Sequence, residues 1–280
     1  MSDPVSYTAV LPIGESTVAF VSGLLAGERA QRRTRKGRRA LGCYRHAVLV
    51  LRWFLDGTRV AQLATDNHLS RSTTYRYLHE AIDVLAAAAP SLHGALLAAR
   101  IAGHTHVHLD GTLIRTDRSK AAGPTAGVDL WWSGKHHHHG GNVQVVTAPD
   151  GWPLWTSPVR PGREHDTTCA RAHAELLPAL DVWSDDEARV VLADLGYEGE
   201  NDRLVCPVKK PGKASGEQLS VDQRTVNMLH SATRALAERG NSLLKTTFKA
   251  LRRVSLCPWR IGAITAAALV LLHIEHNRTT

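Results

Sequence analysis

The sequence contains few of the residues that mark secreted, zinc-binding or membrane proteins. Its 280 residues include four cysteines, Cys43, Cys169, Cys206 and Cys257, which lie far apart and form no C-x-x-C pair. This spacing argues against a zinc ribbon and against a disulfide framework, and it is typical of a reducing cytoplasm. The longest apolar run, IGAITAAALVLLHI, is too short to span a bilayer and predicts a buried helix. The beginning, MSDPVSYTAV, lacks the basic and apolar regions of a secretory signal. We therefore expect a soluble, intracellular protein with no membrane partner.

Acidic residues are outnumbered by basic ones. There are 34 Lys and Arg against 26 Asp and Glu, which gives a net charge of +8 with histidine neutral. A basic chain of this kind favours a polyanionic partner, nucleic acid before membrane. Seven of the basic residues lie in ERAQRRTRKGRR at residues 28–39. This segment is either a solvated linker or a flexible arm that neutralises phosphates.

Residues 41–90 have helical apolar spacing throughout. A short helix that packs through Val60 and Leu63 is followed by a polar turn at Asp66–Asn67. Ser70 or Ser72 can cap a second helix, which we expect to turn three apolar side chains inward: Tyr75, Leu78 and Ile82. Two helices joined in this way form a helix-turn-helix unit or, alternatively, a plain helical hairpin. In the first case the second helix presents four polar residues to a major groove: Arg71, Ser72, Thr74 and Arg76.

From residue 104 the pattern changes to that of an α/β domain with a mixed sheet. Strands are predicted at HVHLDGTLI, VQVVTA, WPLWTSPV, ARVVLADLGY and RLVCPVKK, and helices at DTTCARAHAELLPAL, along residues 220–254 and at the C-terminal apolar run. Asp110 interrupts the first of these strands and Asp194 ends the fourth. Burial of an unpaired carboxylate is costly unless it is paired or binds a metal, although either acid can simply cap the next turn. On the long helix, Glu238 shares one polar stripe with Arg234, Asn241 and Lys245.

Five segments occur together and in order: HLDGTLIR, SGKH with NVQVV and PDGWPLWTS, RPGREHDTT, VVLADLGYEG, and RALAERGNSLLKTTF. They resemble the catalytic domain of bacterial insertion-sequence transposases of the DDE superfamily, in the group named for insertion sequence five, which is related to eukaryotic Harbinger elements. The resemblance implies a ribonuclease-H-like catalytic domain over residues 101–280, a helix-turn-helix domain over 41–100 and an N-terminal segment with a basic arm over 1–40.

The resemblance also implies the roles of individual residues. Asp110, Asp194 and Glu238 correspond to the three catalytic acids, whose oxygens would hold two Mg²⁺ or Mn²⁺ ions. Arg234 and Lys245 would contact phosphates, whereas Ser231 stands where the family has a tyrosine. Asp166, within GREHD, also falls in a family motif and is interpreted as a helix N-cap or as a group that supports the metal ligands, with direct metal binding as the alternative.

Two histidine-rich stretches have competing interpretations. The loop SGKHHHHGG holds His136–His139 and lies where the family has a basic or polar loop, so we expect it to face phosphate, with Lys135 as its firmest contact. A metal-binding role for the run is the alternative. His104, His106, His108 and Asp110 alternate along a predicted strand. They would suit a metal hydrolase instead, but that reading explains neither Asp194 nor the Arg-Glu-Lys helix.

The expected function is that of a transposase. It would bind double-stranded DNA at terminal inverted repeats, cleave it and join the 3′-hydroxyl ends to target DNA by metal-dependent phosphoryl transfer. Pairing of two ends implies a homodimer or larger assembly, and the resemblance implies a bacterial cytoplasm, at the nucleoid. The alternatives are a metal-dependent nuclease without strand transfer and a non-catalytic DNA-binding protein derived from a transposase.

Overall fold

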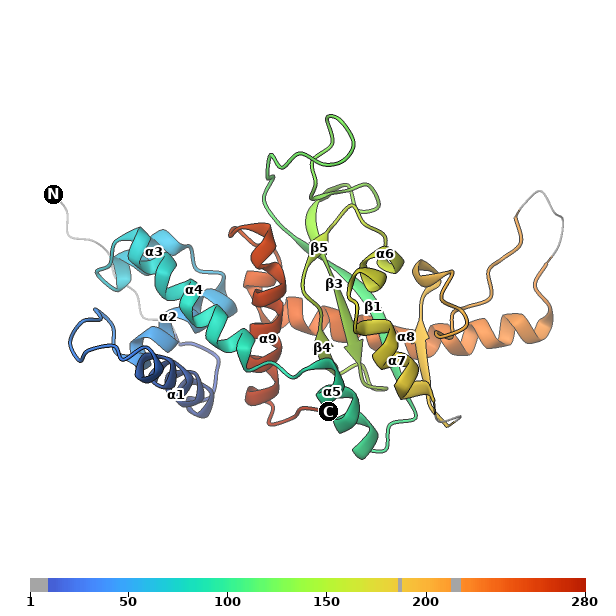
Figure 1. Ribbon diagram of the computed structural model, residues 1–280, viewed down its shortest axis with the longest axis horizontal. Coiled ribbons are helices and arrows are strands. Elements are labelled where there is room, and N and C mark those ends of the chain that lie inside the picture. Colours follow the sequence, from blue (N-terminus) through green and yellow to red (C-terminus); the bar gives the residue numbers. More distant parts are fainter. Residues whose placement is uncertain (1–9, 186–187, 213–217) are drawn as a thin grey trace.

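The computed structural model describes residues 10–185, 188–212 and 218–280 (Figure 1). Its N-terminal part is helical: α1 (Glu15–Gln31), α2 (Cys43–Asp56), α3 (Val60–Asp66), α4 (Arg71–Ala87) and α5 (Leu92–Ile101). The basic segment 28–39 is not wholly an extended arm, because its first residues complete α1. Arg29 is tied to the fold, since its guanidinium donates to the Leu41 carbonyl at 3.0 Å.

The helix pair α3–α4 forms where the sequence predicts it, with Ser70 as the N-cap of α4. The rotational phase of α4 differs from the prediction in one respect. Its buried face runs through Thr74, Tyr77, Leu78, Ala81, Ile82 and Leu85. Tyr75, predicted to point inward, is therefore 41% exposed. Thr74, predicted to contact DNA, is fully buried and donates to the Ser70 carbonyl at 3.0 Å. Arg71, Ser72 and Arg76 remain on the exposed side.

His46 is buried at the centre of the helical part. One ring nitrogen, Nε2, lies 2.7 Å from the Tyr77 carbonyl oxygen, and the other, Nδ1, lies 3.2 Å from the Arg29 guanidinium. Because the carbonyl only accepts and the guanidinium only donates, the ring is neutral with its proton on Nε2. Burial lowers the pKa of His46 from 6.5 to about 4.

This histidine predicts an acid-sensitive helical region. The unfolded chain binds a proton at His46 below pH 6.5, whereas the folded chain does so only near pH 4. The contribution of His46 to the free energy of unfolding is therefore fully present above pH 6.5. It falls as the pH drops toward 4, by up to about 3 kcal/mol. Urea unfolding at several pH values should give a flatter profile for His46→Gln than for the wild type. Equal slopes would contradict the prediction.

The sheet has the strand order β2–β3–β1–β6, with β4 and β5 also paired to β3. Its strands are β1 (His106–Arg115), β2 (Trp132–Ser133), β3 (His138–Thr147), β4 (Pro153–Thr156), β5 (Arg160–Pro161) and β6 (Val190–Ala193). β3 runs antiparallel to β1 and β4, whereas β6 runs parallel to β1. This mixed order confirms the predicted ribonuclease-H-like α/β class.

Two predicted elements of this part are wrong in detail. The segment RLVCPVKK forms no strand, and only Val205 makes an isolated parallel bridge to Leu192. Pro207 follows closely and has no N–H to continue the ladder. The helix predicted at residues 166–180 is broken at His173, whose backbone is extended. It therefore forms α6 (Asp166–Ala172) and α7 (Leu176–Ser184).

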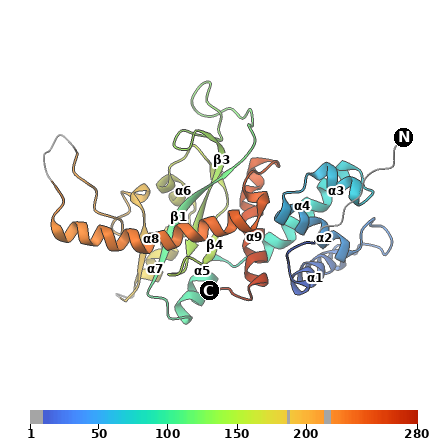
Figure 2. The same cartoon turned by 180° about the vertical axis from the view of Figure 1, so that it is seen from behind.

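Helices cover both faces of the sheet. In Figure 1, α6 and α7 lie in front of the strands and α8 (Val221–Thr247) lies behind them, and Figure 2 shows α8 from its outer side. The C-terminal α9 (Ile261–Glu275) is the predicted buried helix, and it contacts both α4 and β4. One continuous core therefore joins the helical part to the sheet. The domain boundaries at residues 40 and 100 stay a prediction. Among the described residues no single helix is both long enough and apolar enough to cross a membrane. Helices α4 and α5 meet these two criteria only when they are taken together, and the pair is bent.

Candidate active site

Asp110 and Asp194 lie at the same level of two neighbouring strands. β1 and β6 are parallel, and Leu109 is paired with Ala193. The two acids follow these paired residues directly, so the sheet register brings them side by side. Asp194 also caps the short helical turn after β6, since one carboxylate oxygen accepts from the Gly196 amide at 2.7 Å. The capping interpretation and the site interpretation therefore both apply to Asp194.

Helix α8 brings the third acid to this point. Nη2 of Arg234 lies 4.0 Å from Asp110, 3.8 Å from Asp194 and 3.5 Å from Glu238. Three carboxylates from segments far apart in the sequence thus surround one nitrogen atom. From the next turn of α8, the Asn241 amide donates to the other oxygen of Asp110 at 2.7 Å.

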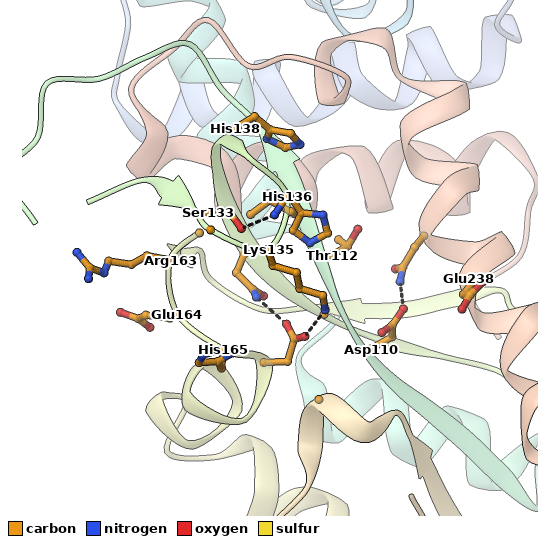
Figure 3. Close-up of a pocket in the computed structure, with 18 of the residues that line it drawn as sticks. Asp110, Thr112, Ser133, Lys135, His136, His138, Arg163, Glu164, His165 and Glu238 are labelled. Atoms are coloured by element: carbon orange, nitrogen blue, oxygen red, sulfur yellow. Dashed lines mark hydrogen bonds and ion pairs between the residues drawn. The ribbon is translucent and has the colours of Figure 1, made fainter. Parts of the chain in front are cut away.

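Asp166, at the first turn of α6, is a fourth carboxylate of this site. It caps no helix, because His165 holds the N-cap position. Its side chain accepts from Asn142 at 2.7 Å and lies 3.6 Å from the Lys135 ammonium group (Figure 3). The glycine that follows Asp110 makes room for it, since a Cβ at Gly111 would lie 2.0 Å from a carboxylate oxygen of Asp166.

A buried chain of hydrogen bonds holds Asp166 in place. The Tyr197 hydroxyl donates to Gln144, Gln144 donates to Asn142 at 2.8 Å, and Asn142 donates to Asp166. Gln144 is fully buried and Tyr197 likewise. Because Oδ1 of Asn142 accepts from Gln144, its Nδ2 group is the one that faces Asp166, and the chain fixes the orientation of this amide.

The charges of the four acids act on one another. Burial raises the pKa of Asp110 to about 6, Arg234 opposes this shift, and Asp194, Asp166 and Glu238 add to it. Burial lowers the pKa of Lys245, which lines the same cavity, while Asp110 raises it. Carboxylates gathered in this way are an unfavourable arrangement unless cations neutralise them.

The donor set fits a hard divalent cation. All four side chains offer carboxylate oxygens, which Mg²⁺ and Mn²⁺ prefer. Oδ1 of Asn241 is buried beside them without a hydrogen-bond partner. As the side chains stand, however, no group of three His, Cys, Asp or Glu residues within the described ranges is positioned to hold a metal. Arg234 lies among the acids, and Glu238 is 64% exposed. In this structure the positive charge among Asp110, Asp194 and Glu238 is therefore the Arg234 guanidinium.

Asp110, Asp166 and Glu238 line a cavity of about 780 Å³ (Figure 3), whereas Asp194 and Arg234 line a second pocket. The same cavity is also lined by basic or titratable side chains: Lys135, His136, His138, Arg163, His165 and Lys245. The histidine run thus contributes to the wall of this cavity, together with the lysine before it. This arrangement suits a ligand that carries both negative charge and bound cations, as a phosphodiester does.

The other predicted features differ in their outcome. His106 and His108 lie together on β1 with ring centroids 5.2 Å apart, whereas His104 precedes the strand. Burial lowers the pKa of His108 to about 4. In the described part of the chain no group of three His, Cys, Asp or Glu residues is positioned to hold a metal, and this holds for these histidines as for the carboxylates. Ser231, at the family's tyrosine position, is exposed and lines a shallow pocket with Asp194 and Arg234.

This sheet with its carboxylates defines a ribonuclease-H-like domain. The model of the DDE superfamily endonuclease family matches residues 109–273, more than half of the chain. The chain belongs to this family.

Comparison with solved structures finds several chains, among them two complexes of another protein. One is the Mos1 transposase paired-end complex with left transposon end, at 12% sequence identity. The other is the Mos1 mariner paired end complex with Mn, at 11% identity. In both, 95% of this chain and 82% of the other are covered, with a TM-score of 0.22. The assignment of the fold is based on the strand order and directions of the sheet and not on this low similarity. No curated protein sequence matches the chain.

Proposed function

We propose that this protein is a transposase of the insertion sequence five group, related to Harbinger elements. It binds terminal inverted repeats, cleaves the DNA there and joins the 3′-hydroxyl ends to target DNA. The observation that carries the proposal is the meeting of Asp110, Asp194 and Glu238 around one atom, within a DDE endonuclease domain. Mg²⁺ or Mn²⁺ is the proposed cofactor.

The side chains divide the work by charge. Asp110, Asp194 and Glu238 hold the metal ligand positions, and Asn142 and Asn241 keep Asp166 and Asp110 oriented. When bound, two divalent ions supply a lowered pKa for the attacking hydroxyl and charge neutralisation at the leaving oxygen. Arg234 neutralises the acids before DNA arrives and then contacts the scissile phosphate.

The remaining cations bind the DNA backbone. Lys135, between β2 and β3, and Lys245, on α8, both line the cavity and serve as phosphate contacts. Arg71, Ser72 and Arg76 on the exposed side of α4 read the repeats, with Thr74 withdrawn from that set. Synapsis of two ends requires a homodimer or larger assembly, which acts at the nucleoid in a bacterial cytoplasm.

An assay with labelled element ends and a supercoiled plasmid target separates the candidate functions. With Mg²⁺ or Mn²⁺ we expect nicked ends and a labelled product joined to the plasmid. Cleavage without joined product would replace the proposal with a nuclease that uses only water. Binding without cleavage in either metal would leave a DNA-binding protein derived from a transposase.

A further inference from the structure

Helix α8 contains a buried glycine at a position where helical propensity disfavours one. Gly240 lies in the interior of the helix, on the side that packs against the sheet. Glycine is among the least favourable residues there, so its presence calls for a reason in the packing. A Cβ at Gly240 would lie 2.0 Å from the carbonyl oxygen of Gly151 and 3.2 Å from Cγ2 of Thr147. At this point α8 therefore has no room for even a methyl group.

The neighbour of Gly240 is itself a glycine, in the turn between β3 and β4. The φ of Gly151 is +87°, a conformation that glycine adopts freely and other residues adopt only with strain. A Cβ at Gly151 would lie 2.0 Å from the carbonyl oxygen of Leu236. Because Leu236 and Gly240 are four residues apart, Gly151 lies against a single turn of α8. Two backbones thus meet here with no side chain between them.

The turn that carries Gly151 is held in place on several sides. The Gly151 amide donates to the Ala148 carbonyl at 2.9 Å, and the Ala148 amide donates to the Trp152 carbonyl at 2.8 Å. Asp150 accepts from the Trp152 amide at 3.0 Å and from the Arg278 guanidinium at 2.6 Å. This guanidinium also lies 4.8 Å from the centre of the Trp152 ring. The turn is therefore a fixed support for α8.

The supported turn of α8 belongs to the carboxylate site. It includes Glu238, and Asn241 follows it directly. The Asn241 amide donates to Asp110 at 2.7 Å (Figure 3). Asp110 lies on β1, which is paired with β3 along most of its length. The strand β3 therefore fixes Asp110 through the sheet, and it fixes α8 through the turn that follows it.

We infer that Gly151 and Gly240 are positioning residues of this site. Their backbone contact sets how closely α8 approaches β1, and thereby where Glu238 and Asn241 stand relative to Asp110. The contact is independent of the proposed function, whereas its consequence for catalysis rests on that function.

The size of the effect follows from the size of the collision. A Cβ placed 2.0 Å from a carbonyl oxygen has to move out to an ordinary C···O separation of about 3.3 Å. The atoms that it meets are backbone atoms, so α8 or the turn has to shift as a whole, by about 1 Å. A misplacement of about 1 Å can lower a reaction rate by about 10²-fold.

The first test compares Gly240→Ala with Gly23→Ala. Gly23 lies inside α1, and its Cβ position has nothing within 4 Å, so the control makes the same change in a helix without a collision. At a temperature where circular dichroism shows both variants folded, Gly240→Ala should lower Mn²⁺ affinity and kcat for cleavage at least about tenfold each. Gly23→Ala should keep the wild-type values. A purely structural role would lower the midpoint of thermal unfolding and leave the Mn²⁺ affinity unchanged, and that result would overturn the inference.

The second test approaches the contact from the turn. Gly151→Ala should reproduce the losses of Gly240→Ala. Gly127→Ala is its control, because Gly127 also has a positive φ, +76°, but nothing within 4 Å of its Cβ position. The two variants therefore share the backbone strain and differ in the collision. Equal behaviour of the two would show that the contact with α8 positions nothing.

The third measurement requires neither metal nor DNA. The side-chain amide signal of Asn241 in a ¹⁵N-labelled chain reports its hydrogen bond to Asp110. It should shift in Gly240→Ala and Gly151→Ala and stay in place in both controls, and an unshifted signal in all four variants would overturn the inference. This result is distinct from the fate of the proposed function. A wild type that cuts no DNA leaves it intact, and variants with wild-type signals and Mn²⁺ affinity refute it even where the wild type cuts.

Discussion

Replacement of Asp110 or Asp194 by asparagine should lower the rate of Mg²⁺-dependent DNA cleavage by at least about 10³-fold, since a lost metal charge removes several kcal/mol of transition-state stabilisation. Asparagine keeps the shape of the side chain, so the fold should persist. Because a negative charge near the phosphates is removed, affinity for element ends should stay equal or rise. Single-turnover cleavage and a binding titration on the same labelled duplex measure the two quantities.

The matched control for these variants is Asp202→Asn. Asp202 lies in an exposed turn after β6, outside the cavity. The Asp202→Asn variant should cleave DNA at the wild-type rate. Retention of more than about a tenth of the activity in Asp110→Asn would mean that Asp110 makes no catalytic contact.

Asp166→Ala is expected to lower both divalent-metal affinity and cleavage by about 10- to 100-fold, the range seen when groups that support a metal site are removed. The reason is its place between Asn142, Lys135 and Gly111, beside the other acids of the candidate site. Mn²⁺ titration followed by calorimetry measures the affinity without reference to activity.

A pair of glycine variants tests the same position without touching a carboxylate. A methyl group at Gly111 would collide with Asp166 and displace it, so Gly111→Ala should reproduce the loss. Gly134 lines the same cavity but has open space at its Cβ position, so Gly134→Ala should bind Mn²⁺ normally. Equal behaviour of the two variants would remove Asp166 from the site.

The placement of Asp110 and Asp194 on their strands could be predicted because the signal is local, an acid in an otherwise apolar strand. Their combination with Glu238 in one site is implied only by the order of the three acids and the resemblance to DDE transposases, because each acid alone equally suits a turn cap or a solvated helix face. The role of Asp166 could not be deduced in this way, because an acid in the first turn of a helix suits a simple electrostatic role there. Only the packing of α6 against β3 and the absence of a side chain at Gly111 show where it points.

The errors in the helical part have a different origin. A helix of this length allows several choices of buried face when most of its positions are small or mixed, and Tyr75 and Tyr77 are equally suitable aromatics for the core. The structure decides for Tyr77 because its hydroxyl accepts the Leu41 amide at 3.1 Å, a contact from another segment. That choice places Thr74 in the core and Tyr75 in solvent.

Residues 213–217 lie outside the described ranges, next to the beginning of α8.

The most direct test of the central claim is a titration of DNA-free protein with Mn²⁺, followed by electron paramagnetic resonance. The account predicts saturable binding by the wild type, with signs of coupling between two neighbouring ions, and loss of that binding in Asp110→Asn and in Asp194→Asn. Absence of saturable binding in the wild type, or full binding in both variants, would contradict it.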